Sequence, residues 1–351
     1  MIILSRKILT ILVMIILICS LSACNNTKKV RFEATFLELF DTVTTIVGYT
    51  KDQDEFSEYA QIIYDKLGEY HKLYDIYNDY EGINNIKTIN DNAGIAPVKV
   101  DQRIIDLLLF SREAYQLTEG KVNVAYGAVL SIWHDYRTEG IDDPVNAKLP
   151  PMDVLKEKAK HTDFNKVMIN EEESTVYLED PKMKLDVGAI AKGYATEKVA
   201  YIVYESGFTS GSLSVGGNVR TLGAKADSKE DWKVGIQNPD TESDETNLYI
   251  LNLKNMSLVT SGVYERFYVV EDKQYHHIID PKTLMPANYY ASVSILTKDG
   301  GLADALSTAV FNMPFEQGLA LVESLSDTEA LWVYSNGDEK FSSGFESYIN
   351  K

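Results

Sequence analysis

The sequence has almost no cysteine. Its two cysteines, Cys19 and Cys24, both lie within the first 24 of 351 residues. The rest of the chain can therefore form neither an internal disulfide nor a cysteine-based metal site. Its core must be held by burial alone, and a chain of this length with 45% hydrophobic residues has enough apolar side chains for that.

The N-terminal apolar run is too short to span a membrane. It is an acid-free segment at 8–21 that follows the basic pair Arg6 and Lys7, whereas a spanning helix needs about 20 apolar residues. A basic start, a short apolar run and small residues at its end are typical of a secretory signal peptide. The sequence therefore predicts a signal peptide at 1–24.

Positive charge is also scarce. The chain has 34 Lys and Arg against 52 Asp and Glu, a formal net charge of −18, and loss of the signal peptide with Arg6 and Lys7 leaves −20. Such a chain repels nucleic acid phosphates and anionic lipid head groups, so we expect no nucleic acid partner. An anionic substrate would need local help from a cation or a helix N-terminus, and this need points to a metal ion.

No long linker and no repeat divides the chain after a polar tether at 25–34, so we expect one large domain at 35–351. Apolar residues at helical spacing predict helices at 55–74, 104–117, 188–206, 301–312 and 315–325. Alternation predicts a strand at 36–49 and short strands at 166–169, 175–178, 212–215, 232–237, 248–253, 267–270, 291–296 and 330–334. Because strands outnumber the helices available for parallel crossovers, the predicted fold class is α+β, with mostly antiparallel sheet and packed helices.

Two turns of small residues are candidate ligand sites. The first, at 188–195, follows an apolar strand end and opens a helix, where the backbone can approach a phosphate whose charge the helix N-terminus and Lys192 would stabilise. The second is Gly216-Gly217-Asn218. A tight structural turn and an ordinary hairpin use the same residues, so from spacing alone both interpretations stay open.

Polar side chains in two later segments are candidates for catalysis. Asp304 and Thr308 lie four positions apart in a helical pattern, so they project from one face and offer oxygen ligands of the kind that Mg²⁺ prefers. An N-cap or a solvated helix face would also use them. His276 and His277 point to opposite faces of a predicted strand, so one of them can serve acid–base chemistry or hold a phosphate, with a structural histidine as the alternative.

The end of the signal peptide, Leu21-Ser22-Ala23-Cys24, resembles the lipobox of bacterial lipoproteins. The resemblance implies cleavage before Cys24, acylation of Cys24, and anchoring of the mature chain at the extracytoplasmic face of the cell membrane. An uncleaved signal anchor and an ordinary secretory signal are the alternatives.

Eight segments in sequence order resemble the ApbE family of FAD:protein FMN transferases and span nearly the whole mature chain. They are 40–42, 122–123, 185–195, 216–218, 232–237, 260–262, 277–281 and 303–308. The resemblance implies an ApbE-like (T-fold-like) domain that uses Mg²⁺ to transfer the FMN moiety of FAD to a Thr or Ser hydroxyl and releases AMP. The implied partners are FAD and acceptor proteins with a Ser/Thr flavinylation motif, either membrane redox subunits or secreted flavoproteins.

The resemblance also implies a role for each matching position. The implied Mg²⁺ ligands are Asp304, Thr308, Ser307 and the backbone carbonyl of Ala189. The implied FAD contacts are Lys192 at the diphosphate, Phe40, Val122 and Asn123 in the flavin or adenine pocket, and Ile278 near the adenosine. His277 is the implied catalytic residue, and we choose it as the base for the target hydroxyl because a histidine pKa suits neutral pH.

Three positions depart from the family pattern. Asn123 stands where Asp is common, Leu284 where Gly is usual, and Ala189 within the glycine pair of the phosphate turn. Two other functions fit the same residues: an FAD pyrophosphatase, in which water replaces the protein hydroxyl, and a non-catalytic flavin-binding lipoprotein. The predicted metal ligands favour catalysis, because flavin binding alone does not need Mg²⁺.

Overall fold

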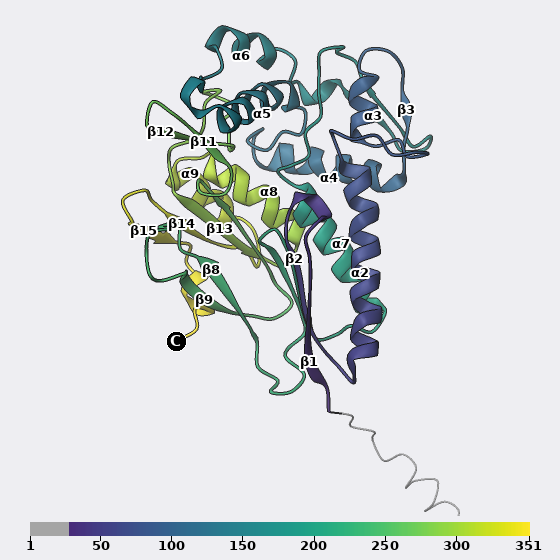
Figure 1. The fold of residues 1–351 in the computed structure, drawn as a ribbon, viewed down its shortest axis with the longest axis vertical. Coiled ribbons are helices and arrows are strands. Elements are labelled where there is room, and N and C mark those ends of the chain that lie inside the picture. The colour runs from purple at the N-terminus through teal and green to yellow at the C-terminus, as the bar shows by residue number, and fades with distance from the viewer. Residues whose placement is uncertain (1–27) are drawn as a thin grey trace, which may run out of the picture.

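The computed structural model describes residues 28–351 (Figure 1). The predicted signal peptide with Cys24, and the first residues of the predicted tether, lie outside the described residues. Within the described part of the chain, no helix has the length and apolar character needed to cross a membrane. Helices and antiparallel sheets together confirm the predicted α+β class.

An eight-stranded sheet forms the centre of the molecule, with every neighbouring pair antiparallel. In spatial order its strands are β1 (Val30–Phe36), β2 (Thr44–Thr50), β6 (Gly211–Val215), β7 (Asn218–Leu222), β10 (Ser257–Gly262), β13 (Ser292–Thr297), β14 (Glu329–Val333) and β15 (Glu339–Phe341). Strands adjacent in sequence form hairpins at both edges, which need only short connections.

Three smaller sheets surround this centre. The first has the order β3 (Val98–Lys99), β5 (Thr175–Leu178), β4 (Val167–Asn170), and the others are the pairs β8 (Trp232–Gln237) with β9 (Asn247–Leu253) and β11 (Phe267–Val270) with β12 (Lys273–His276). The β8–β9 pair packs through Ile236 and Leu251 on one group of central-sheet residues that includes Leu296 and Leu331. This covers one side of the sheet.

Helices cover the other side of the central sheet and extend beyond it (Figure 1). They are α2 (Gln53–Tyr74), α3 (Ile86–Asp91), α4 (Gln102–Leu117), α5 (Gly127–Asp142), α6 (Met152–Ala159), α7 (Ala191–Glu205), α8 (Gly300–Phe311) and α9 (Phe315–Glu323). Side-chain caps start α2 and α8, where Asp52 accepts the N–H of Glu55 and Asp299 accepts the N–H of Leu302.

Helix α8 is buried on nearly all sides. Its Leu306 and Val310 pack with residues of the sheet, whereas Ala305 and Ala309 pack with residues of α2 and α7. Alanines on the second face let α7 approach closely, as expected of a helix enclosed between two layers. The candidate metal ligands on α8 are therefore held by a rigid, fully packed element.

The predicted strand at 36–49 is wrong as a single element. β1 ends at Phe36, a 3₁₀ turn follows at Leu39–Asp41, and β2 begins at Thr44. Phe40 and Asp41 have φ of 54° and 52°, which turns the chain through the left-handed region. The predicted tether is also too long, since β1 begins at Val30, and the helix predicted at 188–206 begins only at Ala191 because the residues before it form the turn.

Candidate active site

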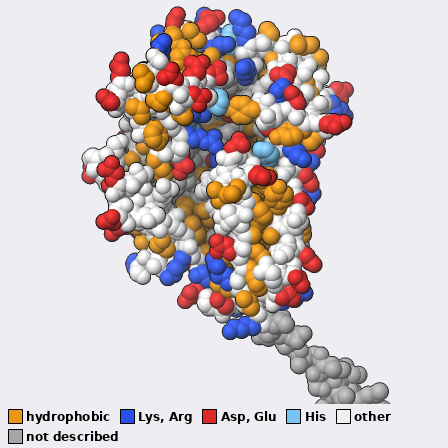
Figure 2. Space-filling model, in the orientation of Figure 1, with side chains coloured by type: hydrophobic (Ala, Val, Ile, Leu, Met, Phe, Trp, Pro, Cys, Tyr) orange, Lys and Arg blue, Asp and Glu red, His pale blue; other side chains and the backbone are white. Residues whose placement is uncertain are grey.

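A cavity of about 530 Å³ opens where α7, α8, the β6–β7 turn and the segment before β11 meet. Figure 2 shows the corresponding hollow on one face of the molecule, with basic and histidine side chains gathered at it. Nine of the ten described candidate residues line this cavity: Phe40, Val122, Asn123, Ala189, Lys192, His277, Ile278, Asp304 and Thr308. Ser307 does not.

Asp304 and Ala189 are brought together by a break in the hydrogen bonding at the start of α7. The Oδ2 of Asp304 accepts the backbone N–H of Gly193 at 2.8 Å. In a regular helix this N–H would donate to the carbonyl of residue 189, four positions earlier. The Ala189 carbonyl consequently accepts no hydrogen bond within the described residues. A carboxylate and an uncommitted carbonyl oxygen therefore both belong to the cavity lining around the start of α7.

The carboxyl group of Asp304 is buried, with only 5% of the residue exposed. Burial raises the pKa of Asp304, while the charge of Lys192 and the hydrogen bond from Gly193 act in the opposite direction. Its Oδ1 has no hydrogen-bond partner among the described residues. A buried carboxylate with one uncommitted oxygen needs a cation to be stable in its ionised form.

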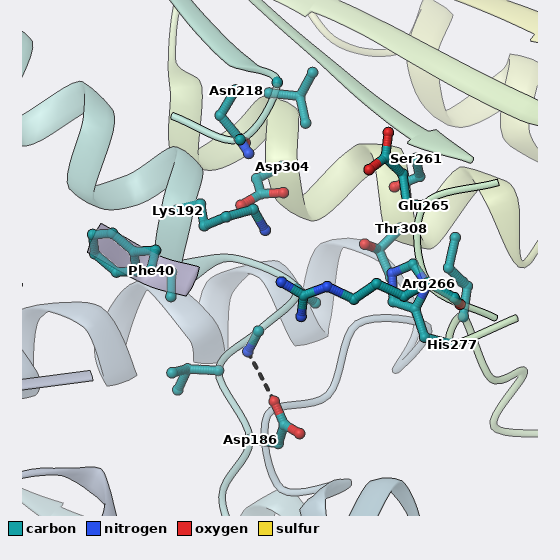
Figure 3. A pocket seen from close by; sticks show the side chains of 18 of the residues that line it. Phe40, Asp186, Lys192, Asn218, Ser261, Glu265, Arg266, His277, Asp304 and Thr308 are labelled. Atoms are coloured by element: carbon teal, nitrogen blue, oxygen red, sulfur yellow. Dashed lines mark hydrogen bonds between the residues drawn. The ribbon is translucent and has the colours of Figure 1, made fainter. Parts of the chain in front are cut away.

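The two hydroxyl groups on α8 differ in direction. Thr308 lines the cavity and its hydroxyl forms no hydrogen bond with the described residues, and Figure 3 shows it on the cavity side of α8. Ser307 is fully buried, its hydroxyl donates to the carbonyl of Asp304 at 2.9 Å, and it lies 2.9 Å from the hydroxyl of Ser261. The prediction of Ser307 as a metal ligand is therefore not supported, because one position along a helix turns a side chain by about 100°.

These oxygens fit Mg²⁺ better than a transition metal. No group of three or more His, Cys, Asp or Glu side chains within residues 28–351 is arranged to hold a metal ion. Mg²⁺ requires no such group, because it keeps several waters and shares its ligands with substrate phosphates. Asp304, Thr308 and the Ala189 carbonyl supply hard oxygen atoms of the required kind.

The two histidines have different surroundings, although only His276, the last residue of β12, lies in a strand and His277 follows it. His276 is buried, its Nε2 lies 2.6 Å from the Ala287 carbonyl, and its Nδ1 accepts the N–H of Ile278. His277 lines the cavity, and its Nδ1 lies 3.2 Å from the Arg266 carbonyl. Because a carbonyl only accepts, Nδ1 of His277 carries the proton and Nε2 is the ring nitrogen left to accept one.

The pKa of His277 differs from the sequence-based expectation. Burial, followed by the positive charge of Arg266, lowers the pKa of His277 to about 3. The choice of His277 for a pKa near neutrality was therefore wrong, although the imidazole is in the neutral form that a base requires. A bound anion would offset the charges of Arg266 and Lys192 and make this ring more basic.

Residues 40–332 match the family model described as the ApbE family. The chain belongs to the ApbE family. The FAD:protein FMN transferase of Treponema pallidum is 30% identical to it over 346 residues, which cover 95% of this chain and 92% of that protein. The FAD:protein FMN transferase of Klebsiella pneumoniae is 28% identical over 268 residues, which cover 75% and 80% of the two chains.

Solved structures of ApbE proteins share the fold. The ApbE protein of Thermotoga maritima superposes with a TM-score of 0.80 at 26% identity, covering 92% of this chain and 100% of that one. The flavin transferase ApbE of Vibrio cholerae gives a TM-score of 0.74 at 21% identity and covers 91% and 99% of the two chains. The predicted ApbE-like domain is thereby confirmed.

Two departures from the ApbE pattern have local explanations. The Nδ2 of Asn123 donates to the Thr162 carbonyl at 2.8 Å, which an Asp could not do, and its Oδ1 accepts the N–H of Ala125. Leu284 has a φ of 62°, the conformation that Gly adopts easily. Its burial and the hydrogen bond from Trp133 Nε1 to its carbonyl compensate for that strain.

Three cavity residues were missed as site residues: Asp186, Arg137 and Arg266. Within the described residues, neither arginine lies within 4.0 Å of a carboxylate, although the chain is strongly acidic. Figure 3 shows the Arg266 side chain extending into the cavity from the side of His277. Because a guanidinium matches the geometry of phosphate oxygens, both arginines are suited to an anionic ligand.

Proposed function

We propose that this chain transfers the FMN moiety of FAD to a Ser or Thr hydroxyl of acceptor proteins, depends on Mg²⁺, and releases AMP. The observation that supports this most directly is the convergence of Asp304, Thr308 and the uncommitted Ala189 carbonyl in a cavity of an ApbE-family chain. The names of its relatives give the reaction class. The basic residues of the cavity explain how a protein with a negative net charge can bind an anionic substrate.

The reaction is a displacement at phosphorus. The acceptor oxygen forms a bond to the FMN-side phosphorus, the bond from that phosphorus to the bridging oxygen breaks, and its electron pair stays on the phosphate of AMP. Bound at Asp304, Thr308 and Ala189, Mg²⁺ would supply charge neutralisation for the diphosphate oxygens. Lys192 and Arg266 add positive charge from the chain itself, which raises the local concentration of the substrate.

The acceptor hydroxyl must lose its proton during this displacement. His277 presents Nε2 to the cavity because the Arg266 carbonyl holds its Nδ1–H. The same carbonyl accepts the backbone N–H of His277 at 3.0 Å, so one group fixes both the ring and the backbone of this residue. We assign proton acceptance to this Nε2.

A single experiment tests the proposed function. The purified chain is incubated with FAD, Mg²⁺ and secreted proteins of the source cell, followed by in-gel flavin fluorescence and mass analysis of the labelled protein. We expect a covalent FMN adduct on a Ser or Thr and one AMP per adduct. Free FMN and AMP without an adduct would identify an FAD pyrophosphatase, and bound FAD without AMP would identify a flavin-binding protein; either result would refute the proposal.

Lys192→Ala is expected to raise the KM for FAD about tenfold or more and to change kcat at saturating FAD much less. Lys192 meets the diphosphate in both the ground state and the transition state, so its loss removes uniform binding. Steady-state kinetics with varied FAD measures both constants. Lys198→Ala is the matched control, because Lys198 lies on the same helix but over the Tyr194 ring at 4.8 Å, away from the cavity. A collapsed kcat with an unchanged KM would instead give Lys192 a transition-state role.

We propose that the mature chain is lipid-anchored at the extracytoplasmic face of the membrane through Cys24. The basis is the lipobox-like sequence alone. Cys24→Ala is expected to abolish incorporation of labelled fatty acid and to leave a precursor that keeps its signal peptide, as seen by gel mobility. Cys19→Ala, in the segment that is removed, is the control and should be acylated normally. Normal acylation of Cys24→Ala would exclude the lipobox.

A further inference from the structure

The turn that carries Phe40 is held in an unfavourable backbone conformation. Phe40 has φ 54° and ψ 29°, and Asp41 follows with φ 52°. The left-handed region costs a residue with a side chain about 1–2 kcal/mol, so two such residues in succession need support from their surroundings. Phe40 lines the cavity and is only half-buried. The strain therefore coincides with a residue that faces the ligand space.

His71 of α2 supplies that support. The backbone N–H of Phe40 donates to Nδ1 of His71 at 3.1 Å. The two rings also meet edge to face, with centroids 5.6 Å apart and an interplanar angle of 79°. Since Nδ1 accepts, the proton of the neutral imidazole is on Nε2. One side chain thus satisfies the amide of the strained turn and packs against the ring that the turn presents.

A chain of hydrogen bonds behind His71 fixes the direction of its ring. Nε2 of His71 lies 3.4 Å from the Tyr80 hydroxyl, and this hydroxyl donates to Oδ2 of Asp75 at 2.8 Å. Burial would raise the pKa of Asp75, but hydrogen bonds from Asn78, Tyr77 and Tyr80 outweigh it and lower the pKa. Burial and Asp75 raise the pKa of Tyr80 to about 12. Asp75 is therefore an acceptor and Tyr80 a donor, so Nε2–H of His71 points to Tyr80.

These hydrogen bonds link two walls of the same cavity. Phe40, His71, Asp75 and Tyr77 all line it: the first comes from the turn before β2, the second from the last turn of α2, and the other two from the segment that follows α2. We propose that His71 is a positioning residue: it holds the Phe40 turn so that the phenyl ring contacts a planar ring of the bound substrate. The proposal rests on the proposed function only in taking FAD, with its isoalloxazine and adenine rings, as the substrate.

Two substitutions at His71 distinguish the effect of its hydrogen-bond acceptor from the effect of its aromatic ring. His71→Phe keeps an aromatic side chain but leaves the Phe40 N–H without an acceptor, whereas Oδ1 in His71→Asn takes the place of Nδ1. We expect the Kd for FAD, measured by flavin fluorescence, to rise roughly tenfold in His71→Phe and only about twofold in His71→Asn. The kcat at saturating FAD should change little in either. Equal weakening by both variants, or none, would overturn the proposal.

A double-mutant cycle tests whether His71 acts through Phe40. Phe40→Ala alone should weaken FAD binding, and adding His71→Phe to it should cause no further loss. An additive loss would mean that His71 affects binding by another route. If His71→Phe does not fold, Tyr80→Phe replaces it in the cycle, with a rise in Kd of about twofold that must also vanish with Phe40→Ala.

FMN and AMP as separate probes show which ring Phe40 contacts. The proposal requires His71→Phe to weaken binding of one of them, FMN for an isoalloxazine contact or AMP for an adenine contact, and unchanged binding of both would overturn it. These measurements need no transfer reaction. If the wild-type chain binds FAD but forms no adduct, the proposed function fails while the effect of His71 on binding is still decided.

Discussion

Asp304→Asn is expected to lower flavin transfer by at least a hundredfold while the melting temperature of the metal-free protein stays the same or rises. The carboxylate is the charged member of the proposed Mg²⁺ ligands, and removing its charge removes the compensation for dehydrating the cation. The stability of the metal-free fold should instead increase on this substitution, because burial raises the pKa of Asp304. A carboxyl whose pKa is raised on folding destabilises the folded state above its ordinary pKa of about 4. The increase in stability that Asn gives should therefore be present at neutral pH. It should disappear as the pH falls from the raised pKa of the folded state to the ordinary pKa of the unfolded chain.

Thermal unfolding with and without Mg²⁺ and FAD, together with the transfer assay, measures both effects. Wild-type protein should gain stability from Mg²⁺ in the presence of FAD, and Asp304→Asn should not. Thr308→Val should show a milder loss of transfer. Asp299→Asn is the matched control on α8, because Asn also caps a helix and Asp299 lies outside the cavity. Near-normal transfer by Asp304→Asn that EDTA still abolishes would mean that the metal ion binds elsewhere.

Gly193→Ala is expected to destabilise the protein by about 3 kcal/mol and to abolish most of the transfer activity. A Cβ at this position would overlap the carbonyl oxygen of Gly300 and lie 2.5 Å from Cβ of Asp304. These atoms belong to packed backbone and to the root of a side chain, so α7 and α8 must separate. Separation also breaks the hydrogen bond from Gly193 to Asp304, which links the two helices at the cavity. Stability and activity should therefore fall together.

Gly68→Ala is the matched control for this substitution. Gly68 lies within α2, and the nearest atom to a Cβ there is Cδ2 of Leu39 at 3.9 Å, an ordinary contact. Ala is favoured over Gly inside a helix by about 1 kcal/mol, so this variant should be at least as stable as wild type. Urea unfolding of both variants gives the comparison. Equal stability of Gly193→Ala and Gly68→Ala would mean that the α7–α8 contact is looser than the structure indicates.

Periodicity predicted the long and the regular elements well. The helix predicted at 55–74 is α2 (Gln53–Tyr74), and the strand predicted at 232–237 coincides with β8. These segments have buried residues at one spacing throughout, so local pattern and tertiary environment agree. The family resemblance, confirmed by the match over residues 40–332, named candidate residues from distant parts of the chain, and all of the described ones except Ser307 line one cavity.

The remaining differences have tertiary causes. The break between β1 and β2 depends on a left-handed turn at Phe40, which no propensity predicts for Phe. Helix α5 was missed because Trp133 and Val129 are buried against distant segments. The low pKa of His277 is produced first by burial and then by the charge of Arg266, whose place depends on the β11–β12 pair. Spacing alone contains none of these contacts.

The length of β1 contributes to the distance between the proposed membrane anchor and the cavity. The seven residues of β1 are separated by six steps of about 3.4 Å, so roughly 20 Å separate Val30 from the end of the strand near the Phe40 turn (Figure 1). With acylation proposed at Cys24, the residues at 25–29 add at most about 20 Å when fully extended. The cavity then reaches hydroxyl groups within roughly 40 Å of the bilayer surface. Height above the membrane, as well as the residues around the hydroxyl, would select which acceptors receive flavin.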